Sequence, residues 1–421
     1  MDVVKAAAAE EEEEEEVHGV VIVGGGLCGL ATALALHRKG IGSLVVERSE
    51  ALRVGGVALN VHANGWRALE ELGLADGLRK TANLITSVRM VRQIQGKNQT
   101  TVSSPRCRKE IRCLRRKDVM EALAKSVPAH TIRYGCRIVA VDQDPGTNCA
   151  VLTMADGNTI KAKVVIGCDG WNSVVAKYVG LGVPSQLPRF IVLGFASYPE
   201  GHPFGTEFSQ IIADDFAVGR VPINENLVHF FVSRSPSPGR TDVDEDAARK
   251  YVLEKVDELP DEVADMVRRC DAASSWTLTK VWYRPPWQVA LAGFRRGAVT
   301  VAGDAMHAMG PFIGQGGSAG LEDAVVLARS LLSSSSAAAA AGDGWAPPAP
   351  PRQQLRDDIG AAIDEYVAER RRRATTLCLH SFAIGTLLTT RWLAVKLACV
   401  AVLALLGGDS RRDADYDCGR L

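Results

Sequence analysis

The sequence predicts an α/β fold in which a parallel sheet is interrupted by an antiparallel-sheet domain and followed by C-terminal helices. A strand, a glycine turn, a helix and a second strand follow one another at residues 19–47. This is a βαβ unit, which implies a parallel sheet. Residues 189–232 form short alternating segments, typical of antiparallel strands with one covered face. A buried strand, a glycine-rich loop and a helix from residue 298 then resume the first domain.

The first half of the chain supplies the parallel sheet and its helices. Apolar residues at helical spacing predict a helix over Leu27–Lys39, between strands at Gly19–Val23 and Ser43–Glu47. The same patterns predict helices at Asn64–Leu72 and Lys117–Ala124 and a strand at Lys163–Cys168.

The second half begins with the alternating segments. Predicted strands are Phe190–Ala196, Phe208–Ala213, Ala217–Val221 and Val228–Val232, with Ala298–Ala302 returning to the first sheet. A polar helix is expected over Arg356–Thr376, and its Arg370–Arg373 run is interpreted as a solvated face rather than a phosphate clamp.

These patterns divide the chain into five parts. We expect a disordered acidic tail at 1–16, a first domain made of 17–186 and 288–332, and an antiparallel-sheet domain at 187–287. A low-complexity loop at 333–353, rich in serine, alanine and proline, precedes C-terminal helices at 354–421.

Composition excludes several classes of protein. The 421 residues are 47% hydrophobic and 23% charged, which suits a globular chain. Without the glutamate run at 10–16, basic residues exceed acidic ones by seven, too few for nucleic-acid binding. The ten cysteines form no CxxC pair, so no metal site is predicted and reduced thiols are expected. The N-terminus lacks signal and transit patterns, which favours a cytoplasmic protein.

One apolar segment is compatible with contact between the protein and a membrane. Residues 377–406 are mostly apolar, but Arg391 and Lys396 interrupt them, and the clean run Leu397–Leu406 is too short to span a bilayer. A packed or interfacial helix is favoured over an anchor, so a membrane-peripheral or organellar protein stays possible.

The glycine turn predicts a Rossmann-like dinucleotide-binding domain. Gly24 permits a tight turn, Gly26 lets a diphosphate approach the backbone, and Gly29 allows close packing of helix and strand. The helix N-terminus offers amides to the diphosphate. Glu47 ends the second strand, where a carboxylate accepts hydrogen bonds from an adenosine ribose.

Two more segments combine a strand end with an aspartate and glycines. Asp304 follows the strand at 299–302 and precedes Gly314–Gly317, so it is suited to a polyol chain beside a glycine loop. Asp169 and Gly170 follow the strand at 163–168 in the same way. Either segment alone is also compatible with an ordinary capped turn.

Together the three segments resemble the FAD-dependent monooxygenases of the aromatic hydroxylase type (group A), especially the plant branch related to salicylate hydroxylases and zeaxanthin epoxidase. The resemblance runs from about residue 19 to 370 and is strongest over Gly303–Ala324. It implies a Rossmann-like FAD-binding domain and assigns residues to the cofactor. Gly24, Gly26, Gly29 and the backbone of Cys28 would hold the diphosphate, Glu47 and Arg48 the ribose, Ile138 the adenine and Asp304 the ribityl chain; Asn60, Arg116 and Asp169 would also contact FAD, with Gly314, Gln315, Gly316, Gly317 and Ser318 along the flavin pyrimidine edge.

The resemblance also implies the reaction. NADPH or NADH would reduce FAD, and O2 would then hydroxylate or epoxidise a small aromatic substrate through a flavin hydroperoxide. No second GxGxxG motif is present, so a separate nicotinamide domain is not expected. Another FAD oxidoreductase, such as a reductase or epoxidase, and a flavoprotein without turnover stay as alternatives. No catalytic side chain is assigned.

Substrate contacts are expected on the antiparallel sheet. His229 and Phe231 lie two residues apart and so share a strand face, with Phe195, Phe208 and Arg220 behind them. An aromatic strand face is also compatible with plain core. His307 is interpreted as a structural hydrogen-bonding residue of the cofactor loop.

Overall fold

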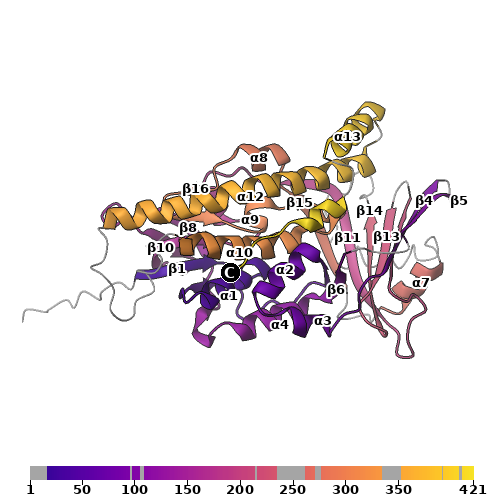
Figure 1. The fold of residues 1–421 in the computed structure, drawn as a ribbon, viewed down its shortest axis with the longest axis horizontal. Helices are drawn as coiled ribbons and strands as arrows, with labels where there is room; N and C mark the ends of the chain where they lie inside the picture. The colour runs from indigo at the N-terminus through magenta and orange to yellow at the C-terminus, as the bar shows by residue number, and fades with distance from the viewer. Residues whose placement is uncertain are drawn as a thin grey trace, which may run out of the picture.

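The computed structural model describes residues 17–94, 97–104, 109–213, 216–234, 261–270, 276–333, 352–390, 392–406 and 410–421. The predicted acidic tail and nearly all of the predicted low-complexity loop lie outside these ranges. The described part is an elongated α/β molecule with a helix-covered sheet at one end and a second sheet at the other (Figure 1).

The first sheet has eight strands and joins distant parts of the chain. Its order is β16-β17-β10-β1-β2-β7, and β9 pairs with both β10 and β8. Valine and isoleucine runs that are buried on both faces explain why parallel strands form its centre. The parallel strands are β1 (Val17–Val23), β2 (Leu44–Val46), β7 (Ile132–Arg133), β10 (Thr159–Gly167) and β17 (Val299–Val301); the antiparallel strands are β8 (Ile138–Gln143), β9 (Ala150–Met154) and β16 (Arg295–Arg296).

The expected return of the chain to this sheet is confirmed, because β17 pairs with β10 in parallel. Helices surround the sheet, and α1 packs directly on α10, almost 300 residues later in the chain. The helices of this region are α1 (Leu27–Arg38), α2 (Ala63–Glu71), α3 (Ala75–Arg79), α4 (Arg116–Ser126), α5 (Val174–Tyr178), α8 (Pro286–Leu291), α9 (Asp304–His307) and α10 (Gly316–Ser333), with 3-10 turns η1 (Ala129–Thr131) and η3 (Pro311–Ile313).

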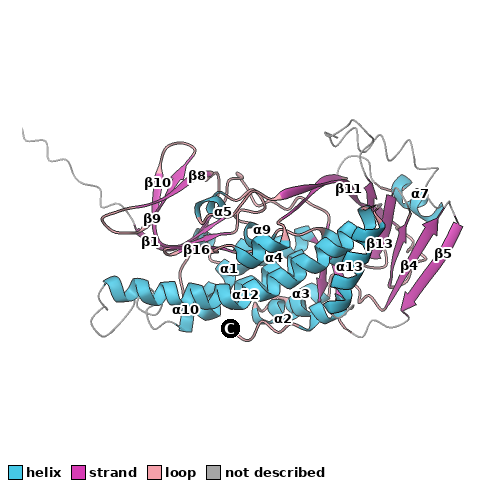
Figure 2. Cartoon of the chain, turned by 90° about the horizontal axis from the view of Figure 1, so that it is seen from above, coloured by secondary structure: helices cyan, strands magenta, loops and turns pink. Residues whose placement is uncertain are grey.

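The second sheet has seven strands in the order β15-β11-β14-β13-β12-β4-β5. One face packs on the main core, and the other forms a separate core with helix α7 (Asp261–Arg268). Figure 2 shows this sheet at one end of the molecule. Its strands are β4 (Ser87–Ile94), β5 (Lys97–Ser104), β11 (Ser185–Ser197), β12 (Glu207–Ile212), β13 (Phe216–Pro222), β14 (Leu227–Arg234) and β15 (Thr277–Tyr283).

The sheet contains three strands that the sequence did not predict, β15 and the two strands of a hairpin. The hairpin β4–β5 comes from residues 87–104, about 100 residues before the other strands, and β4 pairs with β12 in parallel. Every other neighbouring pair is antiparallel. Residues 97–104 are mostly polar, so no alternation marked them as a strand. A small antiparallel ladder of β3 (Ala58–His62) and β6 (Ile111–Arg115) leads to this hairpin.

The C-terminal helices differ in length from the prediction. Helix α12 (Arg352–Thr389) runs along the first domain, and α13 (Leu393–Leu405) projects from its end (Figure 1). No proline interrupts residues 352–389, which explains why the helix continues past Thr376. The turn η4 (Ser410–Asp415) follows. Among the described residues, no helix is both long and apolar enough to cross a membrane.

Candidate active site

At two positions of the turn between β1 and α1, neighbouring protein atoms leave no room for a side chain, so glycine is required. Gly24 has φ +106°, and a Cβ there would lie 2.5 Å from the Cys168 carbonyl oxygen. A Cβ on Gly29 would overlap the Gly24 carbonyl oxygen. The turn therefore packs tightly against the end of β10.

Gly26 is different, because a Cβ there would meet no atom within 4 Å. Its backbone is extended, and no side chain caps the first turn of α1. The amides at this helix start therefore have no side-chain cap, and they carry the positive end of the helix dipole. This arrangement fits a bound diphosphate, which would take the room that a side chain at Gly26 would fill.

Glu47 is buried and holds the glycine turn. Its Oε2 accepts a hydrogen bond from Gly25 N at 2.7 Å, and its Oε1 accepts one from Ser49 N at 3.0 Å. Burial opposes ionisation, but these two amides and Arg53 lower the pKa of Glu47 on balance. Arg53 Nε lies 3.2 Å from Glu47 Oε1, and both Arg53 and Arg48 are exposed to solvent. Arg53 is thus the arginine that contacts the Glu47 carboxylate, and the sequence pattern did not predict this contact.

Three turns that are far apart in the sequence converge at the start of α1. Gly303, at φ +61°, approaches Cys28 so closely that a Cβ would lie 2.9 Å from the Cys28 Cβ. A Cβ on Gly317 would lie 3.5 Å from a Leu27 methyl group. The segments 24–29, 303–304 and 314–318, which were predicted separately, therefore border one region.

Asp304 lies in this region and is accessible to solvent. The protein around it nevertheless raises the pKa of its carboxyl by desolvation, while His307 and Arg116 act in the opposite direction. A carboxylate that solvent reaches although protein surrounds it lies in a recess rather than on a convex surface. The recess therefore presents an acceptor to a polyhydroxyl ligand, and Arg116 is close enough to interact with the carboxylate electrostatically.

Two polar atoms near the recess lack protein partners. Asn60 Oδ1 and Asp169 Oδ1 are buried without a hydrogen bond in the described part of the chain. Asp169 Oδ2 accepts a hydrogen bond from Val174 N at 2.7 Å, and burial raises the pKa of this carboxyl. Buried polar atoms without partners are rare in proteins, so these two fit a site completed by a ligand.

Other predicted cofactor residues have structural contacts of their own. Gln315 Oε1 accepts a hydrogen bond from Asn64 Nδ2 at 2.8 Å, and Ser318 Oγ lies 3.4 Å from His62 N. Ile138 is buried at the start of β8. Two residues before Ile138, the Cys136 amide donates a hydrogen bond to the Glu47 carbonyl oxygen.

A buried ionic network lies behind the recess. His307 Nε2 lies 2.6 Å from Asp323 Oδ2, and Arg370 Nε lies 2.6 Å from Asp323 Oδ1. Burial opposes both charges, but Asp323 raises the pKa of His307, and the two cations hold the pKa of Asp323 below its usual range. Asp323 also accepts from Gly303 N at 2.7 Å, so the network supports the turn that carries Asp304. The structural role expected for His307 agrees with these contacts.

The interpretation of Arg370–Arg373 as a solvated face is wrong. Arg370 is fully buried and also pairs with Glu322 at 2.8 Å, and Arg373 contacts the same carboxylate at 3.0 Å. Arg372 alone of the four is exposed. Arg370 and Arg373 contact this carboxylate because α12 packs on α10, which the local pattern of charges does not reveal.

His229 lies on the sheet face that points toward the first domain. It pairs across the sheet with Phe195 and Val221. Val221 belongs to the main core and Phe195 packs against that core, so His229 faces it as well. Phe231 shares this face, two residues along β14, and its ring packs over Gly219.

Arg220 does not share this face, so its assignment to the substrate site is corrected. It pairs across the sheet with Phe230, one residue from His229, and therefore points to the opposite side. There it is buried, contacts Glu262 of α7 and Glu207, and lies 4.2 Å from the centre of the Phe204 ring. Arg220 thus joins α7 to the sheet.

The protonation of His229 is determined by its surroundings. Nδ1 lies 3.0 Å from the Gly194 carbonyl oxygen, which can only accept, so Nδ1 carries the proton and Nε2 is left as an acceptor. Burial lowers the pKa of His229 to about 4.

This histidine is expected to make the protein acid-sensitive. As pH falls below about 6.5, the unfolded chain binds the proton first, so the stabilisation is complete above that pH and is lost towards pH 4. The loss at about pH 5 is about 2 kcal/mol. We expect His229→Gln to flatten the fall of unfolding free energy between about pH 7 and 5, measured by denaturant titration, and exposed His37→Gln to leave it unchanged. Equal slopes in all three proteins would contradict the assignment.

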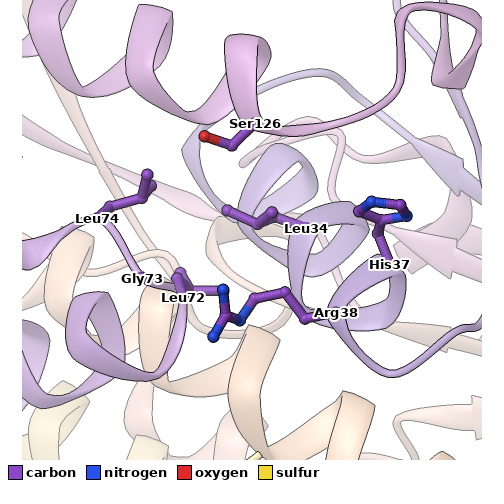
Figure 3. A pocket seen from close by; sticks show the side chains of 7 residues that line it. All are labelled: Leu34, His37, Arg38, Leu72, Gly73, Leu74 and Ser126. Atoms are coloured by element: carbon purple, nitrogen blue, oxygen red, sulfur yellow. The ribbon is translucent and has the colours of Figure 1, made fainter.

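A surface cavity of about 460 Å³ lies at the other end of α1 (Figure 3). Helices α1, α2 and α4 all end there, and their carboxyl termini carry partial negative charge. Arg38 already supplies a cation, because its guanidinium lies against Gly73. The cavity is thus distinct from the recess and unsuited to an anionic cofactor. No group of His, Cys, Asp or Glu among the described residues could hold a metal ion.

Comparison with known proteins gives consistent results. The model of a family described as FAD binding domain matches residues 18–343. Monooxygenase 1 of Arabidopsis thaliana is 43% identical over 400 residues, covering 95% of this chain and 98% of the relative, and Monooxygenase 2 of the same plant is 32% identical, covering 95% and 97%. Klebsiella pneumoniae HpxO complexed with FAD and uric acid has a TM-score of 0.71 at 22% identity, covering 95% and 96% of the two chains, and a salicylate hydroxylase substrate complex has 0.69 at 20%, covering 96% of each.

Proposed function

Because the chain belongs to the FAD-dependent monooxygenases of the aromatic hydroxylase type, we propose that it uses NADPH or NADH and O2 to hydroxylate or epoxidise a small aromatic substrate. One relative is a FAD-dependent urate hydroxylase of Mycolicibacterium vanbaalenii, 27% identical over 318 residues, which cover 72% of this chain and 77% of the relative. Its name supports the proposal that the substrate of this chain is a small molecule. FAD, when bound, supplies the redox chemistry.

The protein positions this cofactor through the recess. The turn at Gly24–Gly29 would hold the diphosphate on its free amides, and Glu47 would orient the adenosine ribose. Asp304 would accept hydrogen bonds from the ribityl hydroxyls. Asn60 and Asp169 would use the oxygens that lack protein partners.

His229 carries the proposal for the substrate. Its Nε2 is an unprotonated acceptor at neutral pH, on an aromatic face with Phe195 and Phe231. A hydroxyl group on an aromatic ring would donate to Nε2 while the ring packs against the phenylalanines. We therefore infer that the substrate is an aromatic compound with a hydroxyl group.

The proposal is tested by the visible spectrum of the purified protein. We expect flavin bands that bleach on anaerobic addition of NADPH or NADH, and faster with one member of a panel of phenols. His229→Gln should keep the flavin and lose the acceleration by the phenol. A flavin that no phenol affects would favour a reductase, and a protein that neither contains nor takes up FAD would overturn the proposal.

Asp304→Ala is expected to weaken FAD binding by about 10- to 100-fold, because a hydrogen bond to a charged group contributes about 1.5–3 kcal/mol. Fluorescence titration of the apoprotein with FAD measures the effect. The matched control is Asp76→Ala, which removes an exposed aspartate on α3. Equal FAD affinity in Asp304→Ala and the original protein would remove Asp304 from the cofactor site.

A further inference from the structure

Helix α13 exposes apolar side chains on most of its surface. Of its thirteen residues, Cys399 alone is buried. Leu393 is 69% exposed, Leu397 60% and Leu405 88%, and Trp392, just before the helix, is 78% exposed. Leaving this much apolar surface in water is costly, so a patch of this kind marks an interaction site.

The exposed residues are too widely spread for a single protein surface. With 3.6 residues per turn, the exposed positions from Leu393 to Leu405 cover an arc of about 220°. A helix packed on a neighbouring protein usually buries a stripe of about 100° or somewhat more. Lipid acyl chains can contact a wider arc of the helix than a single protein surface can.

The charges near α13 suit an anionic surface. From Ala374 to Gly408 the sequence contains no aspartate or glutamate, and Arg391 and Lys396 are its lysine and arginine residues. Trp392 stands next to Arg391 in the sequence, and tryptophan prefers the boundary between headgroups and acyl chains. Basic residues next to an anionic bilayer are attracted to it.

A second helix, α8, also exposes apolar side chains. On α8, Trp287 is 57% exposed and Leu291 83% exposed. Trp287 contacts Phe382 of α12, with ring centres 5.9 Å apart. Figure 1 shows α8 and α13 on the same side of α12. Both helices can therefore meet one surface together.

We propose that α13 inserts at the boundary between the headgroups and the acyl chains of a bilayer that contains anionic lipid, with α8 resting on the same surface. The helix is about 20 Å long and the hydrocarbon core about 30 Å thick, so α13 lies in the interface rather than across it. The enzyme is then a peripheral membrane protein that meets its substrate near lipid. The proposal does not depend on the identity of the substrate.

Vesicle flotation of the full-length, FAD-loaded protein tests this proposal. We expect the protein to float with vesicles of phosphatidylcholine and phosphatidylserine, less with phosphatidylcholine alone, and less at high salt. The double variant Leu397→Glu, Val400→Glu changes two exposed positions and should lower binding by more than about tenfold with unchanged flavin content. Leu84→Glu, at a position 40% exposed that bridges to Arg112 of β6, is the matched control and should float normally.

Two results would overturn the proposal. One is protein that stays with the soluble fraction in the presence of excess anionic vesicles. The other is a dimer, seen by analytical ultracentrifugation, that the double variant dissociates while vesicle binding is absent in the original protein. In that case α13 binds a second copy of the chain.

Discussion

Gly29→Ala is expected to lower the free energy of unfolding by about 3 kcal/mol or more and to abolish FAD binding. The new Cβ would overlap the Gly24 carbonyl oxygen and lie 3.3 Å from the Cys168 Cβ. The nearest clash is with backbone, so no side-chain rotation relieves it, and α1 must move away from the end of β10. That movement opens the turn whose amide, Gly24 N, donates to Val46 O at 2.9 Å.

A neighbouring glycine separates stability from cofactor binding. Gly26→Ala places its Cβ in open space, so the apoprotein should unfold at the same denaturant concentration as the original. Its FAD affinity should nevertheless fall, because the methyl group enters the space proposed for the diphosphate. Denaturation of the apoproteins and FAD titration measure the two effects. Gly26→Ala with unchanged FAD affinity would place the diphosphate elsewhere.

Arg370→Met is expected to destabilise the protein by about 3–5 kcal/mol. The change leaves Glu322 and Asp323, both fully buried, without the cation that contacts each of them at 2.8 and 2.6 Å. Methionine fills similar space but supplies no donor. Because Asp323 also holds Gly303 N, we expect a weaker hold on FAD as well.

Two variants distinguish this effect from a general disturbance of α12. Arg372→Met removes an exposed arginine two residues away and should change the unfolding free energy by less than about 0.5 kcal/mol. Arg370→Lys keeps the charge but cannot donate from two fixed nitrogens, so an intermediate loss is expected. Guanidinium chloride titration measures all three proteins, and equal stability of Arg370→Met and Arg372→Met would contradict the importance of the buried network.

Local features of the sequence were sufficient to predict the glycine turn between β1 and α1. Gly24, Gly26 and Gly29 stand between a strand and a helix. Gly24 and Gly29 have no room for a side chain, because other atoms of the turn or the end of β10 lie too close, whereas Gly26 has open space beside it. Alternation likewise predicted correctly that His229 and Phe231 share a face, because side chains alternate within one strand.

Contacts between distant segments were beyond the reach of such patterns. The face of Arg220 relative to His229 depends on the register of β13 against β14, and a shift of one residue reverses it. The polar hairpin β4–β5 belongs to the second sheet because β4 pairs with β12.

The sequence by itself determined the α/β class, the glycine turn and the family, because these depend on periodicity and on residues close together in the chain. Tertiary structure decided which charges are buried. Arg370 and Arg373 have the pattern of a solvated helix, yet carboxylates about 50 residues earlier on α10 pair with them in the core. The exposure of α13 was decided in the same way, since its apolar sequence suits both a core helix and a membrane surface. The packing of α12 against the first domain leaves α13 outside the core.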